Sequence, residues 1–349
     1  MSPDDNAAIH ADSLTVRGPL ASLIRRLARL GAGLLLWPTA ALSLLAMLAS
    51  HWWLADLVVH FRIQYLAVAL LGALLAMGLG ERTLLALAGI CAALNIGPVI
   101  AYFHADLAPM ELARADTRAT PSLANVRIAG LNVFFRNTNY DGVAAWIHEI
   151  KPHAVVLIEA DRHWEQAMAK RLPDYPHRWL SIERGGQLGK LILSREPFLE
   201  RASIASRSVR ADSPLVTLAV DGVRFQLTAV HTVWPMGPDE QAARNRDLVG
   251  LGEWASTASL PLIAIGDYNV SPFSPHFDRL LADGSLRRAS AGRGWLPTFP
   301  TFLSLAGIQI DHLLVSSDIA VRDLRTAQGL GSDHRALIGD LQISARSTP

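Results

Sequence analysis

The sequence contains very little cysteine and almost no net charge. Its single cysteine, Cys91, excludes a disulfide framework and a zinc site built on cysteines. Lysine and arginine together number 32 against 31 aspartates and glutamates, so the chain has no bulk positive charge with which to bind a nucleic acid backbone. Charged residues make up 18% of the chain, below the ~25% of an average soluble protein, whereas hydrophobic residues make up 50%. A disordered acidic or basic chain is therefore excluded.

The apolar residues are concentrated in the first third of the chain. Three segments without a charged residue run from Gly31 to Ala49, from Ile63 to Gly80 and from Thr83 to Phe103. Each approaches the ~20 apolar residues that a membrane-spanning helix requires. Buried helices of a soluble protein usually keep a polar face, and a cleaved signal peptide would be shorter and would not be followed by further apolar segments. The sequence therefore predicts a membrane anchor of three transmembrane helices within residues 28–104.

Basic residues near these segments predict the orientation of the anchor. Four arginines precede the first segment, namely Arg17, Arg25, Arg26 and Arg29. Only Arg62 lies between the first and the second segment. Because positive loops stay on the cytoplasmic side, residues 1–27 are expected to be cytoplasmic. Three spans then place the remaining chain outside the cytoplasm, which for a multi-pass protein of a bacterial inner membrane is the periplasm.

The composition changes after the third apolar segment. Residues 105–125 are mixed and polar with two prolines, which predicts a linker. From residue 126 to 349 the hydrophobic segments are short and separated by Gly, Pro, Asp and Asn, which indicates a water-soluble domain. Strands are predicted at 126–133 and 154–160. Between them a helix is expected that ends at Ile150 and is capped by Asp141. Further strands are expected at 190–194, 215–220, 224–231, 261–267, 310–316 and 336–344, with a helix at 238–256. Strands outnumber helices, so two sheets in one domain are expected.

Polar side chains occur where the apolar strands begin or end. They are Asn132, Glu159, His231, Asp267, Asn269, Asp311, His312, Asp333 and His334. Each alone has an ordinary explanation, as a surface carboxylate, a hydrogen-bonded core histidine or a turn former. An apolar strand that ends in a carboxylate or imidazole can also project that group from a rigid sheet edge, which is where α/β proteins commonly build their sites.

In this order, the motifs resemble the endonuclease/exonuclease/phosphatase superfamily. The motifs are LNV, IEA, AVH, GDYNVSP, QIDHLLVS and GSDHRAL, and the resemblance covers residues 126–343. That superfamily includes deoxyribonucleases, abasic-site endonucleases, inositol polyphosphate phosphatases and neutral sphingomyelinases. The resemblance implies an α/β (α+β) fold, a four-layer α/β/β/α sandwich of two packed sheets flanked by helices, which the three transmembrane helices here precede.

The resemblance also implies roles for these residues. Glu159 is expected to be the principal metal ligand, with Asn132 beside it and Asp333 completing the site. Carboxylate and amide oxygens favour a hard cation, so Mg²⁺ is expected, with Mn²⁺ as the alternative. Five catalytic residues are implied. Asp267 is expected to deprotonate the attacking water, and Asn269 to hold a phosphate oxygen. His334 is expected to contact the phosphate with Asp311 orienting its ring, and His231 is expected to be a general acid or phosphate ligand. His312 stands where the family often has tyrosine and is interpreted as structural.

The sequence departs from the family's DNA-repair members in one place. Phe134 and Phe135 follow Asn132 where those members carry small or acidic residues, so a second metal ligand is missing and a repair nuclease is disfavoured. Three arginines, Arg287, Arg288 and Arg293, are interpreted as a solvated loop rather than a basic patch. Trp234, Phe273 and Trp295 are interpreted as packing aromatics, with the lining of a substrate cleft as the alternative.

These observations predict a membrane-anchored, metal-dependent phosphoesterase that hydrolyses a phosphodiester or phosphomonoester by attack of water. The expected partners are the lipid bilayer and a phosphate-ester substrate, either a lipid headgroup or a nucleic acid, and no protein partner is inferred. The alternative is a catalytically silent membrane protein that uses the sandwich for binding or assembly. Silent members normally lose metal or histidine positions, and the eight metal and catalytic positions named above are all present here.

Overall fold

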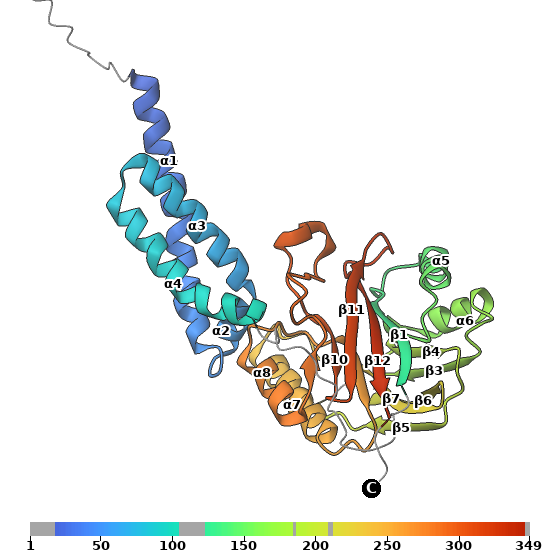
Figure 1. The fold of residues 1–349 in the computed structure, drawn as a ribbon. Coiled ribbons are helices and arrows are strands. Elements are labelled where there is room, and N and C mark those ends of the chain that lie inside the picture. Colours follow the sequence, from blue (N-terminus) through green and yellow to red (C-terminus); the bar gives the residue numbers. More distant parts are fainter. Residues whose placement is uncertain (1–17, 105–122, 184–185, 209–211, 346–349) are drawn as a thin grey trace, which may run out of the picture.

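The computed structural model describes residues 18–104, 123–183, 186–208 and 212–345. These residues form a bundle of apolar helices and a β-sandwich that pack against each other (Figure 1). Most of the predicted cytoplasmic segment, 1–27, and of the predicted linker, 105–125, lies outside the described residues.

The bundle consists of three long helices, α1 (Pro19–Leu45), α3 (Arg62–Leu79) and α4 (Arg82–His104). Short turns of helix connect α1 to α3: η1 (Ala46–Leu48), α2 (Trp53–Val58) and η2 (Val59–Phe61). The three candidate spans are long and apolar enough to cross a membrane, as predicted. Helix α1 begins well before its uncharged segment, because Pro19 suits a first helical position. Small residues bring the helices close, since a Cβ added at Gly72 would lie 2.6 Å from Leu36 Cδ2.

Two six-stranded sheets form the sandwich. The first has the order β11-β12-β1-β2-β4-β3 and the second has the order β5-β6-β7-β8-β10-β9. The strands of the first sheet are β1 (Leu123–Asn132), β2 (Ala154–Ala160), β3 (His177–Ile182), β4 (Gly189–Ser194), β11 (Ile319–Ala327) and β12 (Ala336–Ser344). Those of the second are β5 (Glu200–Ile204), β6 (Ser213–Val220), β7 (Val223–His231), β8 (Leu262–Asp267), β9 (Arg287–Arg288) and β10 (Asp311–Val315).

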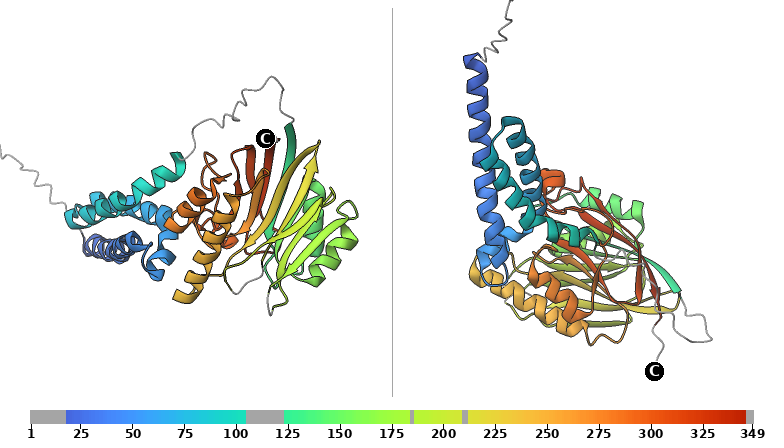
Figure 2. Two further views of the ribbon diagram at one scale, coloured as in Figure 1. Left: turned by 90° about the horizontal axis from the view of Figure 1, so that it is seen from below. Right: turned by 60° about the vertical axis from the view of Figure 1, so that its left-hand side comes forward.

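Helices cover the outer face of each sheet (Figures 1 and 2). They are α5 (Tyr140–Ile150) and α6 (Arg162–Arg171) on the first sheet, and α7 (Pro238–Ala255) and α8 (Pro275–Gly284) on the second. Apolar side chains such as Ile128, Val156, Phe225 and Ile263 fill the space between the sheets. The predicted four-layer α/β/β/α sandwich, preceded by three apolar helices, is confirmed.

Several local predictions were incomplete or wrong. The sequence patterns do not predict β3, β5, β9, β11, α6 and α8. Asp141 does not cap α5, because the Asn139 side chain accepts the hydrogen bond from Gly142 N and Asp141 lies in the first turn. The arginines do not form a solvated loop: Arg288 is buried against Tyr102, and Arg287 donates to backbone carbonyls such as that of Ile319.

The bundle docks on the sandwich through both apolar and polar contacts. Val59, Val99 and Tyr102 of the bundle form one buried cluster with Phe273 of the sandwich. The Tyr102 hydroxyl donates to Gln309 Oε1 at 2.9 Å. Phe273 belongs to the segment that follows β8 and Gln309 to the segment that precedes β10, and both segments adjoin the catalytic residues predicted above.

Candidate active site

Strand pairing brings the predicted site residues to one edge of the sandwich. Strands β1 and β2 are parallel, with Asn132 opposite Ile158, so Asn132 lies beside Glu159. In the second sheet His231 is opposite Asp267, which in turn is opposite Asp311. Because the two sheets pack face to face, their ends present these groups to a common space, and all eight predicted site residues lie there or at its border.

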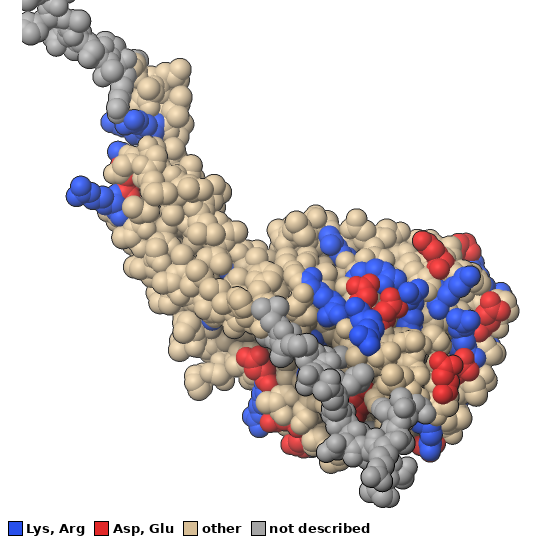
Figure 3. Space-filling model, in the orientation of Figure 1, with Lys and Arg blue, Asp and Glu red and all other residues tan. Residues whose placement is uncertain are grey.

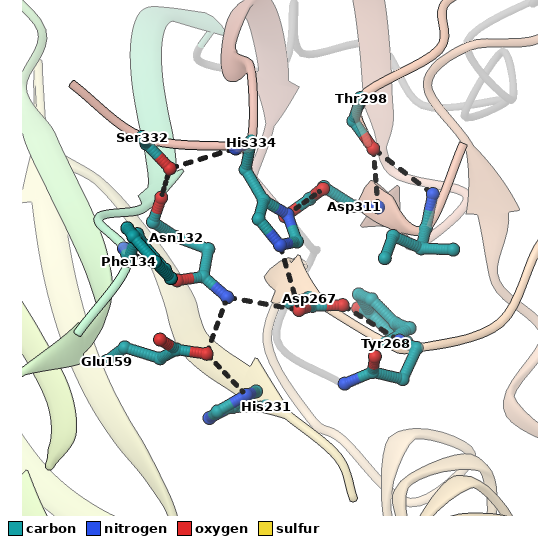
Figure 4. A network of polar contacts seen from close by, with 12 residues as sticks. Asn132, Phe134, Glu159, His231, Asp267, Tyr268, Thr298, Asp311, Ser332 and His334 are labelled. Carbon is teal, nitrogen blue, oxygen red and sulfur yellow. Dashed lines mark hydrogen bonds and ion pairs between the residues drawn. The ribbon is translucent and has the colours of Figure 1, made fainter. Parts of the chain in front are cut away.

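Asn132 joins the two halves of the site (Figure 4). Its Nδ2 donates to Glu159 Oε1 at 3.2 Å and to Asp267 Oδ2 at 3.1 Å. Its Oδ1 accepts a hydrogen bond from Phe134 N at 3.1 Å. In this arrangement the amide orients the two carboxylates, and a role for Asn132 as a metal ligand stays a prediction.

His334 lies between two carboxylates of the second sheet. Its Nδ1 is 2.8 Å from Asp311 Oδ2, and its Nε2 is 3.9 Å from Asp267 Oδ2. Burial alone would lower the pKa of His334, but the carboxylates of Asp311, Asp267 and Asp333 together outweigh burial and raise that pKa to about 10. His334 is therefore a cation at neutral pH. Asp311 holds its ring in place, and the Asp311 backbone N is itself fixed by a hydrogen bond to Thr298 Oγ1 at 3.1 Å.

Asp267 is a carboxylate with a raised pKa. It is fully enclosed, and burial together with the nearby Asp311 charge raises its pKa, against the opposing effect of His334. The backbone N of Asn269 donates to Asp267 Oδ1 at 2.9 Å. A carboxylate whose pKa is shifted toward neutrality is suited to accept a proton from water.

His231 is oriented by a residue that the sequence analysis missed. Its Nδ1 is 2.9 Å from Glu183 Oε1, and its Nε2 is 3.8 Å from Glu159 Oε1. Glu183 follows β3, a half-buried strand without a clear alternating pattern, so no local signal marked it. Ser332, which lies in the GSDHRAL motif, was given no role: its hydroxyl donates to Asn132 O at 2.6 Å and accepts from His334 N at 2.9 Å.

The backbone is unusual at the site. Glu159 has a φ of 60° and Asn269 has a φ of 49°, in the left-handed region that non-glycine residues seldom adopt. Gly266 precedes Asp267 with a φ of 150°, and a Cβ there would lie 1.9 Å from Val230 O. Only glycine allows β7 and β8 to approach this closely next to Asp267. Such backbone strain tends to occur where function requires a particular side-chain direction.

The carboxylates fit a divalent cation. Among the described residues, Asp333 Oδ1 is one of the few buried polar atoms that accept no hydrogen bond. Burial raises the pKa of Asp333, and the nearby charges of Glu159 and Asp311 raise it further. Glu159 Oε2 accepts a hydrogen bond from Phe135 N at 2.9 Å, which fixes its direction. Crowded carboxylates with an unpaired, shielded oxygen are the donors that Mg²⁺ and Mn²⁺ favour.

A second group also has ligand spacing. Ligand atoms of Asp267, Asp311 and His334 lie within 4.8 Å of one another. However, His334 Nδ1 and Asp311 Oδ2 already hydrogen-bond each other, so neither atom is free to bind a metal. Glu159 and Asp333, whose Oδ1 has no hydrogen-bond partner among the described residues, are therefore the carboxylates that could hold a cation.

The site opens into a cleft of about 370 Å³. Its walls include the aromatic residues Phe134, Phe135, Trp234 and Phe299. Trp234 therefore lines the cleft, the alternative considered for it, and is 58% exposed. Phe273 and Trp295 instead pack on Tyr102 at the bundle. His312 is buried with Nε2 2.8 Å from Val270 O, and burial lowers its pKa to about 3, as suits a structural role.

Comparison with known proteins agrees with this fold. The model of the Endonuclease/Exonuclease/phosphatase family matches residues 129–334. The fold is similar to that of an endonuclease/exonuclease/phosphatase from Bacteroides vulgatus, with a TM-score of 0.54, 18% identity, and coverage of 63% of this chain and 99% of that chain. No curated protein matches the sequence.

Two further structures show how varied the relatives are. The mannosyl-6-phosphatase Bt3783 of Bacteroides thetaiotaomicron has a TM-score of 0.51 and 18% identity, covering 62% of this chain and 99% of that chain. D. rerio TDP2, solved with a single-strand DNA product, has a TM-score of 0.51 and 15% identity, covering 62% and 98%. At these identities the likeness extends to the fold alone.

Proposed function

Because the chain belongs to the endonuclease/exonuclease/phosphatase family, whose members hydrolyse phosphoesters, we propose that it is a divalent-metal-dependent phosphoesterase anchored in a membrane. The observation that carries this proposal is the convergence of Glu159, Asp333, Asp267 and the Asp311–His334 pair on one cleft. One relative named above is a mannosyl-6-phosphatase, and another was solved with a DNA product. Membership of the family alone therefore does not select the substrate.

Glu159 and Asp333 would hold the cation, and Asn132 keeps the Glu159 carboxylate turned toward the cleft. When bound, Mg²⁺ or Mn²⁺ would neutralise charge on the phosphoryl oxygens and help the leaving oxygen depart. The cation would also favour the ionised form of Asp333, whose pKa is raised in the metal-free site.

The remaining residues bind the phosphate and move a proton. Asp267 accepts a proton from the attacking water, for which its raised pKa is suited. His334, held as a cation by Asp311, donates to a phosphoryl oxygen as negative charge develops there. Asn269 Nδ2 is anchored to Thr232 O at 3.0 Å, which leaves its second N–H for the same phosphate. His231 borders Glu159 and is placed to contact the leaving group.

We place the catalytic domain outside the cytoplasm. Arg29 pairs with Glu81 at 2.5 Å, so the start of α1 and the turn between α3 and α4 lie at the same end of the bundle. Figure 3 shows positive residues at this tip and an uncharged surface from there to the sandwich. The positive tip favours the cytoplasm. A C-terminal reporter that is active only outside the cytoplasm tests this placement, and activity of a cytoplasm-specific reporter would contradict it.

The test of function uses the full-length protein in detergent micelles. A panel of chromogenic phosphodiester and phosphomonoester, DNA, RNA and phospholipid is assayed with Mg²⁺, with Mn²⁺ and with EDTA. We expect metal-dependent turnover of at least one panel member. Asp267→Ala and His334→Ala should abolish it with the fold intact by circular dichroism, whereas Asp283→Ala, on the exposed end of α8, should not.

Two outcomes would refute the proposal. Wild-type activity in both Asp267→Ala and His334→Ala would show that the mechanism is wrong. Absence of metal-dependent turnover on every substrate would favour the alternative of a catalytically silent binding or assembly protein.

A further inference from the structure

The exposed apolar residues of the sandwich gather around the cleft. Among the described residues after 122, the large hydrophobic side chains that are exposed number eight in all. Six of them flank the cleft or belong to one neighbouring loop: Phe135, Trp234, Met236, Phe302, Leu303 and Leu305. Exposed apolar side chains that gather in this way mark a contact surface, unlike apolar side chains scattered singly over a protein.

The most exposed of these residues lie on the loop that contains η3 (Thr301–Ala306). Phe302 is 80% exposed and Leu305 is 69% exposed. The loop does not fold back to bury them, because its backbone is held from several sides. Trp295 Nε1 donates to Leu305 O at 3.0 Å, and Thr301 N donates to Asp333 O at 2.8 Å. The structure therefore presents these side chains outward in a fixed conformation.

Gln64 holds the same loop against the helix bundle. Its Nε2 donates to Ala306 O at 2.9 Å and to Gly307 O at 2.8 Å. Gln64 lies in the first turn of α3, a candidate membrane span. The loop is thus fixed against the first turn of α3, and Figure 1 shows it rising beside α3 above β10.

We propose that the loop from Pro300 to Gly307, together with the apolar rim of the cleft, inserts into the outer leaflet of the membrane that the three helices span, so that the cleft takes its phosphoester from the lipid plane. The substrate class is then a lipid phosphoester. This step rests on the proposed phosphoesterase function. Hydrolysis adds the hydroxyl of water to phosphorus, breaks one P–O ester bond and leaves the second proton of that water on the departing alcohol.

The orientation of the cleft supports this placement. The site residues lie where β1, β2, β7 and β8 end, and β12 runs away from that edge (Figure 1). The η3 loop rises from the same edge. On its inner side, the ring of Phe299 lies 4.8 Å from the ring of His334. One short segment therefore contacts the anchor, the catalytic histidine and, through Phe302 and Leu305, the expected lipid.

A fluorescent probe tests insertion directly. In a Cys91→Ala background, Phe302→Cys in the full chain is labelled with an environment-sensitive fluorophore in vesicles of phosphatidylethanolamine and phosphatidylglycerol. Leu199→Cys is the matched control, since Leu199 is 48% exposed but follows the far end of β4. We expect quenching of the probe at 302 by doxyl-labelled lipid and protection from aqueous iodide, with the opposite pattern at 199.

Two other results of the probe experiment overturn the proposal. Quenching by iodide at 302 means that the loop faces water. Protection from iodide without quenching by doxyl lipid means that a protein, such as a second copy of this chain, covers the loop.

A matched pair of substrates tests the consequence for activity. Methyl 4-nitrophenyl phosphate is soluble, whereas hexadecyl 4-nitrophenyl phosphate is embedded in vesicles, and both release the same phenol. The double variant Phe302→Ser/Leu305→Ser should lower kcat/KM for the embedded ester by about tenfold, because two apolar side chains lose their lipid contact. Activity on the soluble ester should be unchanged, and Leu199→Ser should alter neither.

The substrate pair separates the two proposals. If wild-type protein hydrolyses the soluble ester but the double variant keeps full activity on the embedded ester, the insertion proposal is wrong and the phosphoesterase stands. If neither these esters nor any member of the substrate panel described above is hydrolysed with any metal, the phosphoesterase fails, and the probe at 302 still decides whether the loop inserts.

Discussion

A buried ion pair joins the helix bundle to the sandwich. Asp56 of α2 pairs with Arg244 of α7, with side-chain exposures of 1% and 0%. Asp56 also accepts the hydroxyl of Ser274 at 2.6 Å, and Arg244 donates to Asn269 O at 3.0 Å. Burial lowers the pKa of Arg244, and the Asp56 carboxylate opposes that change. The pair therefore connects the anchor to the loop that carries a predicted catalytic residue.

Replacing Asp56 by Ala should destabilise the docked structure strongly. It leaves a guanidinium buried without its counter-charge, and loss of one partner of a buried pair costs about 3–5 kcal/mol. At about 2–4 °C per kcal/mol for a domain of this size, the melting temperature of the sandwich should fall by about 6–20 °C. If the bundle detached from the sandwich, Arg244 would return to water. The loss of stability in Asp56→Ala therefore cannot exceed the free energy with which the bundle docks on the sandwich.

The assay is thermal unfolding of the full chain in micelles, followed by tryptophan fluorescence, with hydrogen exchange across residues 268–274. Asp141→Ala is the matched control, since it breaks the pair with Arg171, in which Asp141 is 86% exposed, and should change the melting temperature little. Asp56→Ala/Arg244→Met removes both charges and should recover most of the stability. If Asp56→Ala shifts the melting temperature no more than Asp141→Ala does, the pair does not hold the anchor on the sandwich and this reasoning is refuted.

Three further predictions concern the site and the core. Glu159→Gln should lower the affinity for Mn²⁺ by about tenfold or more in calorimetric titration, because a charged ligand oxygen is lost, and unchanged affinity would place the metal elsewhere. Asp311→Asn should lower kcat by about 10²–10⁴-fold, because His334 loses the carboxylate that keeps it charged. The same substitution should move the alkaline limit of the pH–rate profile downward from about pH 10. An alkaline limit that does not move would exclude His334 as the cation. His312 has a folded pKa of about 3 against ~6.5 unfolded, so the unfolded state binds the extra proton and stability falls as pH drops below ~6.5. The loss at pH 5 is about 2 kcal/mol. In His312→Gln, the difference between the free energies of unfolding measured by denaturant titration at pH 8 and at pH 5 should be smaller by this amount than in the wild type. The same difference in both proteins would contradict a buried, neutral His312.

The predicted site residues could be found in the sequence because their positions are local signals. Asn132, Glu159 and Asp267 each end an apolar run, and strand pairing then brings such ends together. The elements that were missed have weaker patterns. The charged residues of β11, Ile319–Ala327, obscure its alternation, and β3 is half-buried along its whole length.

Contacts between distant segments left no local signal. Glu183 orients His231 from 48 residues away, and Asp56 reaches Arg244 across 188 residues. Asp56 and His60 lie in a stretch that the sequence analysis assigned only to the membrane anchor. Composition identifies such a stretch as apolar, but a single aspartate or histidine within it does not reveal which distant partner it will meet.

The polar contacts of the bundle reach the two segments that also position the catalytic groups. His60 Nδ1 lies 2.8 Å from Ser271 Oγ, four residues after Asp267, and Tyr102 binds Gln309, two residues before Asp311. A shift of the bundle would displace both segments and, through them, the carboxylates on either side of His334. The bundle therefore packs as an additional layer on the sandwich, and this packing fixes the direction in which the cleft faces.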